Sequence, residues 1–273
     1  MSATATGKGC YTNPPTDLAP QNGLVAWYDS ASAVFSGTNI LSWKDKTAFP
    51  NNLSAAPGQD LMTSNFNFNG NLLYKYGIEF QAPSTGVSIF LVCSFCNSTS
   101  ATFPSANNIV TIFSSNYLSA QPVGTAFSVS LYNPATPLKF FVNTYDLSNY
   151  VTYSIEQSVG VLTGKQILNA LCFNSNFGGS YSRAYINGIN VSCNTNLINI
   201  SSNMNSFNIW LGDVSPSKTG PDGINHFNSG SYSLYEVLVY NRVLTQTEIS
   251  SVNRYLSGKN GTAALANSGN FQY

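Results

Sequence analysis

The pattern of apolar and polar residues is clearest near the C-terminus. From residue 232 to residue 240 apolar side chains fall on both alternating sets of positions, and Ser233 and Glu236 are the exceptions. A run of strand length with two apolar faces is typical of a strand inside a β-sandwich. Because Glu236 interrupts one of these faces, we expect its carboxylate to be hydrogen-bonded or to lie near an edge.

A short helix is predicted directly after this strand. Thr245 and Glu248 have the Thr-x-x-Glu spacing of a capping box, in which each side chain bonds the backbone N–H of the other residue. This spacing places the first helical residue at Gln246. Apolar residues continue at helical spacing as far as residue 256, and Gly258 is the expected stop. The helix then has about three turns.

Shorter apolar runs recur along the rest of the chain with turn residues between them, which predicts an antiparallel all-β sandwich. The Asn187-Gly188 pair lies between β-branched residues and is a strong signal for a two-residue hairpin. No internal repeat supports a solenoid or a propeller. Strands are expected at residues 23–29, 40–46, 72–80, 87–95, 109–114, 126–132, 139–144, 151–154, 165–174, 182–191, 208–212 and 232–240.

Composition agrees with this fold class. Aromatic residues make up 13% of the 273 residues, and the helix-forming residues Glu and Lys are scarce. The length allows two domains, but all-β sandwiches of this size commonly form one unit. We therefore expect a single jelly roll at residues 21–258, with an extended arm at residues 1–20 and a tail at residues 259–273.

Four motifs resemble the concanavalin A-like lectin/glucanase superfamily, in particular its laminin G-like jelly rolls. They are Trp27-Tyr28-Asp29, Ser42-Trp43-Lys44-Asp45, the Tyr185–Gly188 hairpin and the closing segment from Glu236 to Leu244. The resemblance implies the fold and leaves the function open, because this superfamily contains lectins, glucanases, adhesion modules and structural domains.

Two interpretations of the first two motifs follow. In the structural one, Trp27 and Trp43 are core residues and Asp29 and Asp45 cap turns. In the functional one, Asp29 or Asp45 belongs to a ligand or calcium shell.

The residue inventory argues against enzymatic activity. Glucanases of this superfamily place carboxylates at alternate positions of one strand, whereas none of the four glutamates here has an acidic residue two positions away. The only histidine, His226, falls in residues 223–230, which we expect to form an exposed loop. No phosphate-binding or dinucleotide motif is present in the sequence.

With enzymatic activity disfavoured, ligand binding is the next function to consider, and one polar segment is a candidate binding site. The segment after the 208–212 strand contains Asp213, Asp222, Asn225 and His226, and lectin-type relatives bind sugars on such loops. Calcium takes six to eight oxygen ligands, so Asp213 and Asp222 make a weak calcium pair. We expect no cofactor, with calcium as the alternative.

Charge restricts the partners. Charged residues are 8% of the chain and the 11 basic residues balance the 11 acidic ones, so nothing indicates binding to nucleic acid or to an anionic membrane.

The sequence shows no targeting segment. Residues 1–10 lack the apolar core of a signal peptide, and no apolar run is long enough to span a bilayer.

These features lead to three functional hypotheses. The first is a structural or surface component of a large assembly, such as a minor capsid or spike protein of a large DNA virus. It would reside on a virion assembled in the cytoplasm and contact other protein subunits through its terminal arms. The alternative is a secreted, glycan-binding (lectin-like) adhesion module, and the third hypothesis is a divergent glycoside hydrolase.

Cysteines and sequons leave the compartment open. Cys93 and Cys96 lie three apart on a predicted strand and would point to opposite faces, which argues against zinc. Cys172 and Cys193 flank a predicted hairpin and form either a disulfide or, as expected in a chain made in the cytoplasm, buried thiols. Five N-x-S/T sequons begin at Asn52, Asn97, Asn190, Asn199 and Asn260.

Overall fold

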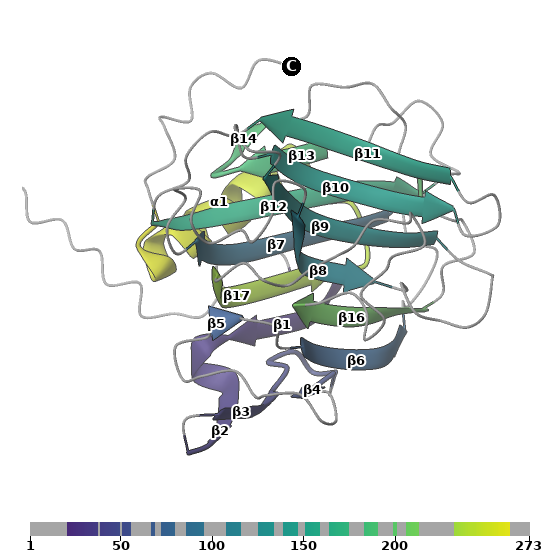
Figure 1. Ribbon diagram of the computed structural model, residues 1–273. Helices are drawn as coiled ribbons and strands as arrows, with labels where there is room; N and C mark the ends of the chain where they lie inside the picture. The colour runs from purple at the N-terminus through teal and green to yellow at the C-terminus, as the bar shows by residue number, and fades with distance from the viewer. Residues whose placement is uncertain are drawn as a thin grey trace, which may run out of the picture.

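The structure is a computed structural model with two facing β-sheets and one helix (Figure 1). It describes residues 21–37, 39–49, 51–55, 67–68, 72–79, 86–95, 108–115, 125–133, 139–146, 151–158, 164–174, 183–190, 199–200, 206–212 and 232–262. The terminal arm at residues 1–20 and most of the C-terminal tail lie outside these residues.

The first sheet brings the two ends of the described chain together. Its strands run in the order β1 (Leu24–Asp29), β17 (Tyr232–Tyr240), β7 (Gly86–Phe95), β12 (Lys165–Asn174), β13 (Arg183–Ile186) and β14 (Ile189–Asn190). Two short strands join its sides, β5 (Asn67–Phe68) on β17 and β15 (Asn199–Ile200) on β12. All of these pairs are antiparallel except β12 with β15.

The second sheet faces the first and is entirely antiparallel in its described pairs. Its order is β11 (Val151–Ser158), β10 (Lys139–Asp146), β9 (Thr125–Asn133), β8 (Asn108–Ser115), β16 (Ser206–Gly212), β6 (Leu72–Glu79), β4 (Leu53–Ala55), β3 (Asn39–Trp43) and β2 (Ala33–Ser36). A 3₁₀ turn, η2 (Ser30–Ser32), links β1 to β2 and so carries the chain from one sheet to the other.

The predicted all-β sandwich with one C-terminal helix is confirmed. Every strand predicted from the sequence has a counterpart, and β12 and β17 coincide with their predictions at both ends. The strands β2, β4, β5 and β15 were missed, because two to four residues are too few to establish a period of two.

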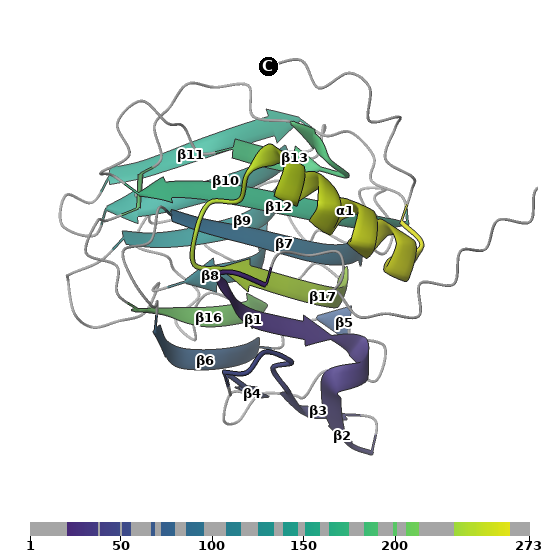
Figure 2. The same cartoon turned by 180° about the vertical axis from the view of Figure 1, so that it is seen from behind.

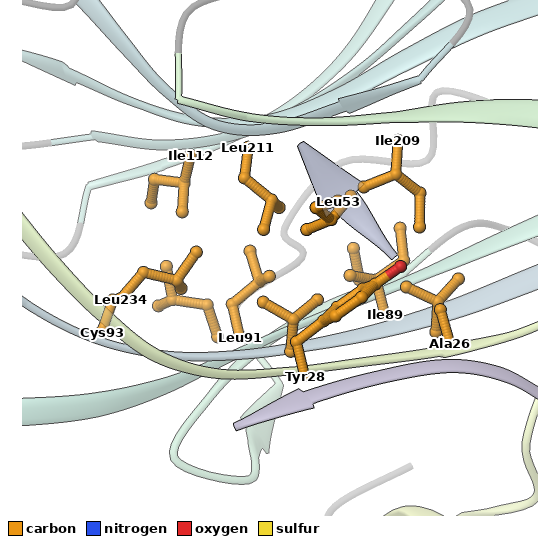
Figure 3. Close-up of a cluster of buried hydrophobic side chains, with 14 of the residues drawn as sticks. Ala26, Tyr28, Leu53, Ile89, Leu91, Cys93, Ile112, Ile209, Leu211 and Leu234 are labelled. Atoms are coloured by element: carbon orange, nitrogen blue, oxygen red, sulfur yellow. The ribbon is translucent and has the colours of Figure 1, made fainter. Parts of the chain in front are cut away.

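The main core lies between the sheets. Figure 3 shows Leu91 and Cys93 of β7 pointing toward Ile112 of β8 and Leu211 of β16, and all four side chains are fully buried. Successive residues of a strand point to opposite faces. The residues between them on β7, Phe90 and Val92, therefore point away from this core.

A second apolar layer lies on the outer face of the first sheet, where α1 (Gln246–Asn260) covers it (Figure 2). Phe90 and Leu238 from the sheet pack there with Ile249, Val252 and Leu256 from the helix. β17 is thus buried on both faces, which is why its sequence is apolar at both alternating sets of positions.

The helix begins as predicted and ends later than predicted. Thr245 Oγ1 accepts a hydrogen bond from Glu248 N (3.4 Å), and a Glu248 carboxylate oxygen accepts one from Thr245 N (2.8 Å), so the capping box is confirmed. Gly258 was wrongly predicted as the stop. The cap is Gly261, at φ +62°, because Lys259 and Asn260 bond to the first sheet and hold two further residues in the helix.

The predicted hairpin is present between β13 and β14. Asn187 and Gly188 adopt φ values of +51° and +80°, as a type I′ turn requires. Asn187 also continues the ladder of β12: its N–H donates to Ile167 O and its Oδ1 accepts from Ile167 N, both at 2.8 Å. Its Nδ2 donates to Gln166 Oε1 (2.6 Å).

Replacing Asn187 with alanine tests this turn. Asn187→Ala removes the side-chain hydrogen bonds and places a less tolerant residue at positive φ, so we expect a loss of about 2 kcal/mol in the free energy of unfolding. Urea denaturation measures the change. Thr247→Ala, at an exposed helix position, is the control and should change stability by less than about 0.5 kcal/mol. Equal losses in the two variants would contradict the assignment.

The capping box also predicts a pH dependence. Two hydrogen bonds from the Arg242 guanidinium (2.6 and 2.9 Å) hold the pKa of Glu248 at about 2, below its usual value. Since the folded-state pKa lies below the unfolded one, this pair stabilises the fold above the unfolded pKa, and its contribution is lost as the pH falls toward about 2.

The stability difference between the native chain and Glu248→Gln should therefore shrink between about pH 5 and pH 2. Denaturant titrations over a pH series measure it. Because both proteins share every other titrating group, the difference isolates Glu248. A difference that is constant over this range would contradict the assignment.

Candidate functional site

Two carboxylates lie side by side where β1, β17 and α1 meet. Asp29 and Glu236 are cross-strand partners in the register of β1 with β17, and they are 2% and 0% exposed. Two adjacent buried negative charges require compensation in a medium of low dielectric constant. Lys46, Lys259 and Trp27 provide it, and we call these five residues the buried charge cluster.

Lys259 connects the two carboxylates. Its Nζ lies 2.7 Å from Asp29 Oδ2 and 2.8 Å from Glu236 Oε1. Lys46 Nζ lies 2.6 Å from the same Asp29 oxygen. Two ammonium groups therefore balance two carboxylates, and the cluster has no net charge.

Neutral donors complete the coordination of Glu236. Trp27 Nε1 donates to Glu236 Oε1 (2.9 Å), and Asn260 Nδ2 donates to Glu236 Oε2 (2.8 Å). The Trp27 ring also faces the two ammonium groups, with its centroid 4.0 Å from Lys46 Nζ and 5.5 Å from Lys259 Nζ. A tryptophan face attracts cations, which adds to the stability of the arrangement. The prediction that Glu236 is hydrogen-bonded is confirmed.

The charges of this cluster are mutually stabilised. Burial alone would raise the pKa of Asp29, but the ammonium groups of Lys259 and Lys46 outweigh burial and hold that pKa below its usual value. Burial would likewise lower the pKa of Lys259, and Glu236 and Asp29 together raise it instead. Both directions favour the ionised forms, so the cluster is a set of ion pairs at neutral pH.

This geometry supports a structural role for Asp29. Asp29 is the N-cap residue of the η2 turn and shares a capping box with Ser32, as the structural interpretation predicted. Its Oδ2 carries two ammonium groups of the chain itself, where a calcium ion would need several free oxygens. A glycosidase would need an open space between two carboxyl groups, whereas Lys259 bridges these two beneath the end of α1.

Asp45 organises the loop between β3 and β4. Its two carboxylate oxygens accept hydrogen bonds from Trp27 N (3.0 Å), Thr47 N (2.9 Å), Thr47 Oγ1 (2.8 Å) and Asn51 N (3.3 Å). Burial raises the pKa of Asp45 in spite of these donors. The prediction that Asp45 caps a turn is confirmed, and both oxygens are used by protein donors. We call residues 44–49, 51 and 52 the Asp45 loop.

Further contacts fix the Asp45 loop to β1. Asn51 Nδ2 donates to Val25 O (2.8 Å), and the Tyr28 hydroxyl donates to Asn51 O. Lys46 N donates to Trp27 O (2.8 Å). The loop is thus bonded along β1 from Val25 to Tyr28.

Both predicted core tryptophans are buried. Trp43 is fully buried between the sheets, and its Nε1 donates to Asp29 O (2.6 Å). Trp27 is 4% exposed and lies on the helix-covered face. The structural interpretation of these two residues is confirmed.

Other predicted site residues lie outside the described chain. Asp213, Asp222, Asn225 and His226 all fall in residues 213–231, so the predicted ligand rim stays a prediction. Within the described ranges, no group of three or more His, Cys, Asp or Glu side chains is arranged to hold a metal ion. The one described helix is too short and too polar to cross a membrane.

The described cysteines are core residues. Cys93 and Cys172 are free thiols buried between the sheets, and burial raises both pKa values. Cys172 therefore forms no disulfide in this structure, as expected for a buried thiol. Cys10, Cys96 and Cys193 lie outside the described residues.

The sequons are not equivalent in the structure. Asn260 Nδ2, the nitrogen to which a glycan would be attached, is bonded to Glu236 Oε2 and to Leu256 O (3.1 Å). A glycan at Asn260 would replace one of the two Nδ2 hydrogens and so remove at least one of these two bonds. Asn52 and Asn190 are exposed, whereas the side chains of Asn97 and Asn199 lie outside the description.

Sequence reasoning missed the two lysines and Asn260. The one available signal was Glu236 itself, because a carboxylate on a buried strand in a chain with only 8% charged residues needs a cation. That signal could not identify the partner, since Lys259 is 23 positions from Glu236 and was assigned to the tail.

Comparison with known proteins supports the fold alone. No family model and no curated protein matches the sequence. Solved structures of botulinum neurotoxin binding domains do match. They include the serotype G binding domain (TM-score 0.52, 14% identity, covering 86% of this chain and 51% of that chain). A structure named the HCR/D W1238A mutant also matches (TM-score 0.53, 12% identity, covering 85% of this chain and 52% of that chain).

A third match is the receptor binding domain of the C/D mosaic serotype, with a TM-score of 0.51, 12% identity and coverage of 85% of this chain and 51% of that one. The chain spans about half the length of the structures it matches. These likenesses agree with the β-sandwich fold of this chain.

Removing Lys259 tests the buried charge cluster. Lys259→Met leaves Glu236 buried without a cation, which typically costs 3 to 5 kcal/mol. Because the Lys259 side chain is partly exposed, solvent screening reduces this, and we expect a loss of about 2 kcal/mol. Urea denaturation measures it. Arg254→Met, at an exposed position of the same helix, is the matched control and should leave the unfolding midpoint unchanged. Equal effects would show that the cluster contributes no stability.

Proposed function

We propose that this chain is a non-catalytic, glycan-binding module of the lectin type. The observation that carries the proposal is the likeness of about 85% of the chain to structures named as binding or receptor-binding domains. Those structures are about twice as long, so their receptor binding is transferred to this chain as a hypothesis only.

The chemistry of the described residues is consistent with binding rather than hydrolysis. The adjacent buried carboxylates, Asp29 and Glu236, are bridged by Lys259 and hold the helix on the sheet. Asp45 uses both oxygens to shape its loop. Asp29, Glu236 and Asp45 are therefore not available to a substrate as a carboxyl pair.

The assembly hypothesis has a different basis. A virion or capsid role rests on the low charge and on the composition of the terminal arms, and the N-terminal arm lies outside the described residues. The compared structures do not support it, and it stays a prediction, as does localisation on a particle.

A glycan array tests the proposed function. We expect the purified chain to bind at least one class of glycan, with the same pattern in calcium and in EDTA, because Asp29 and Glu236 are ion-paired with lysines of the chain and both oxygens of Asp45 accept hydrogen bonds from the protein. Incubation of each bound glycan with the chain should release no reducing sugar. Heat-denatured protein is the control. Absence of binding in both conditions would remove the proposal, and sugar release would replace it with hydrolysis.

A further inference from the structure

Four large apolar side chains are exposed among those whose burial the structure describes. Within the described ranges they are Phe35, Leu41, Phe49 and Ile189, at 40%, 45%, 38% and 56% exposure. The first three lie on β2, on β3 and in the Asp45 loop, and Figures 1 and 2 both show β2, β3 and β4 together at one end. Ile189 lies on β14, at the far edge of the first sheet.

Phe49 differs from the other three in being held on a fixed loop. Phe49 N donates to Thr47 Oγ1 (3.2 Å), and Phe49 O accepts from Thr47 Oγ1 (3.1 Å) and from Asn51 N (2.8 Å). Thr47 and Asn51 are themselves bonded to Asp45. An aromatic ring on a rigid backbone loses little conformational entropy when a ligand binds.

The residues around Phe49 in the loop are polar and accessible. Lys44 is exposed and has no ion-pair partner in the described part of the chain. Asn52 is exposed and uses its Oδ1 to accept from Asp45 N (2.9 Å), which leaves its Nδ2 hydrogens without a described protein acceptor. The only acidic residue of the loop, Asp45, is directed into it by its own hydrogen bonds.

We propose that the Asp45 loop is a glycan contact site, in which a sugar ring stacks on Phe49. This inference rests on the proposed function and adds the location of the binding site. The C–H bonds of a pyranose carry partial positive charge and match the negative face of an aromatic ring. The Asn52 amide donates to a sugar hydroxyl, and Lys44 favours glycans with an acidic substituent. In this loop an exposed aromatic ring, polar donors without a described acceptor and a backbone fixed by internal bonds occur together.

The test uses the full chain produced in bacteria, so that Asn52 carries no glycan, and the strongest glycan from the array as the probe. Removing a stacking ring typically costs about tenfold or more in affinity, so Phe49→Ala should weaken binding by at least about tenfold. Phe49→Tyr keeps the ring and should bind within about threefold of the native chain. Ile189→Ala removes an exposed apolar side chain at the distant edge and should have no effect.

Isothermal titration or biolayer interferometry measures the affinities, and urea denaturation checks that each variant is folded. Lys44→Ala, which changes no described contact, supplies a second measurement: it should weaken binding of acidic glycans and reduce the dependence of binding on salt. If the native chain binds and both Phe49→Ala and Lys44→Ala bind equally well, the loop is not the site and the proposed function still holds. If the native chain binds no glycan, the proposed function itself fails.

Discussion

The ion pairs of Lys259 are the constraint on which the rest of this structure depends. They join the last residues of α1 to Asp29 on the first strand and to Glu236 on the last strand. The Lys259 ammonium group is therefore the point at which these three segments contact one another. Burying two adjacent carboxylates would be strongly unfavourable without cations, and that cost is offset only when the helix lies on the sheet. The cluster therefore specifies where α1 ends and which strands are neighbours, in addition to any net stability that it contributes.

Trp27 links this cluster to the loop at the end of the sheet. Its indole N–H donates to Glu236 and its backbone N–H donates to Asp45, so one residue of β1 contacts both the helix attachment and the Asp45 loop. Lys46 makes the same connection from the loop side, since its backbone bonds Trp27 O and its ammonium group bonds Asp29. The loop is rigid because it is part of the same network of hydrogen bonds as the closing helix.

The sequence predicted what depends on local periodicity and local chemistry. Alternation located the strands, the Asn187-Gly188 pair located the hairpin, and the Thr245–Glu248 spacing located the helix start. The prediction from sequence failed where a contact with a residue distant in the sequence determines the structure. Gly258 is a good local stop signal, yet the helix passes it because Lys259 and Asn260 reach Glu236. The partners of Asp29 are 17 and 230 positions away, and no local pattern encodes such pairs.

The same reasoning limits where a binding function can lie in the described chain. Charged groups that could bind a ligand judging from the sequence, such as Asp29 and Glu236, instead form ion pairs within the fold. The cluster that they form with the lysines is neutral. What remains accessible in the Asp45 loop is a set of uncharged or singly charged groups on a fixed backbone, with the Phe49 ring among them. Recognition built from such groups depends on shape and hydrogen bonding more than on net charge, which suits a neutral or weakly acidic sugar better than a highly charged polymer. The low overall charge of the chain and the chemistry of the Asp45 loop thus lead to the same class of ligand.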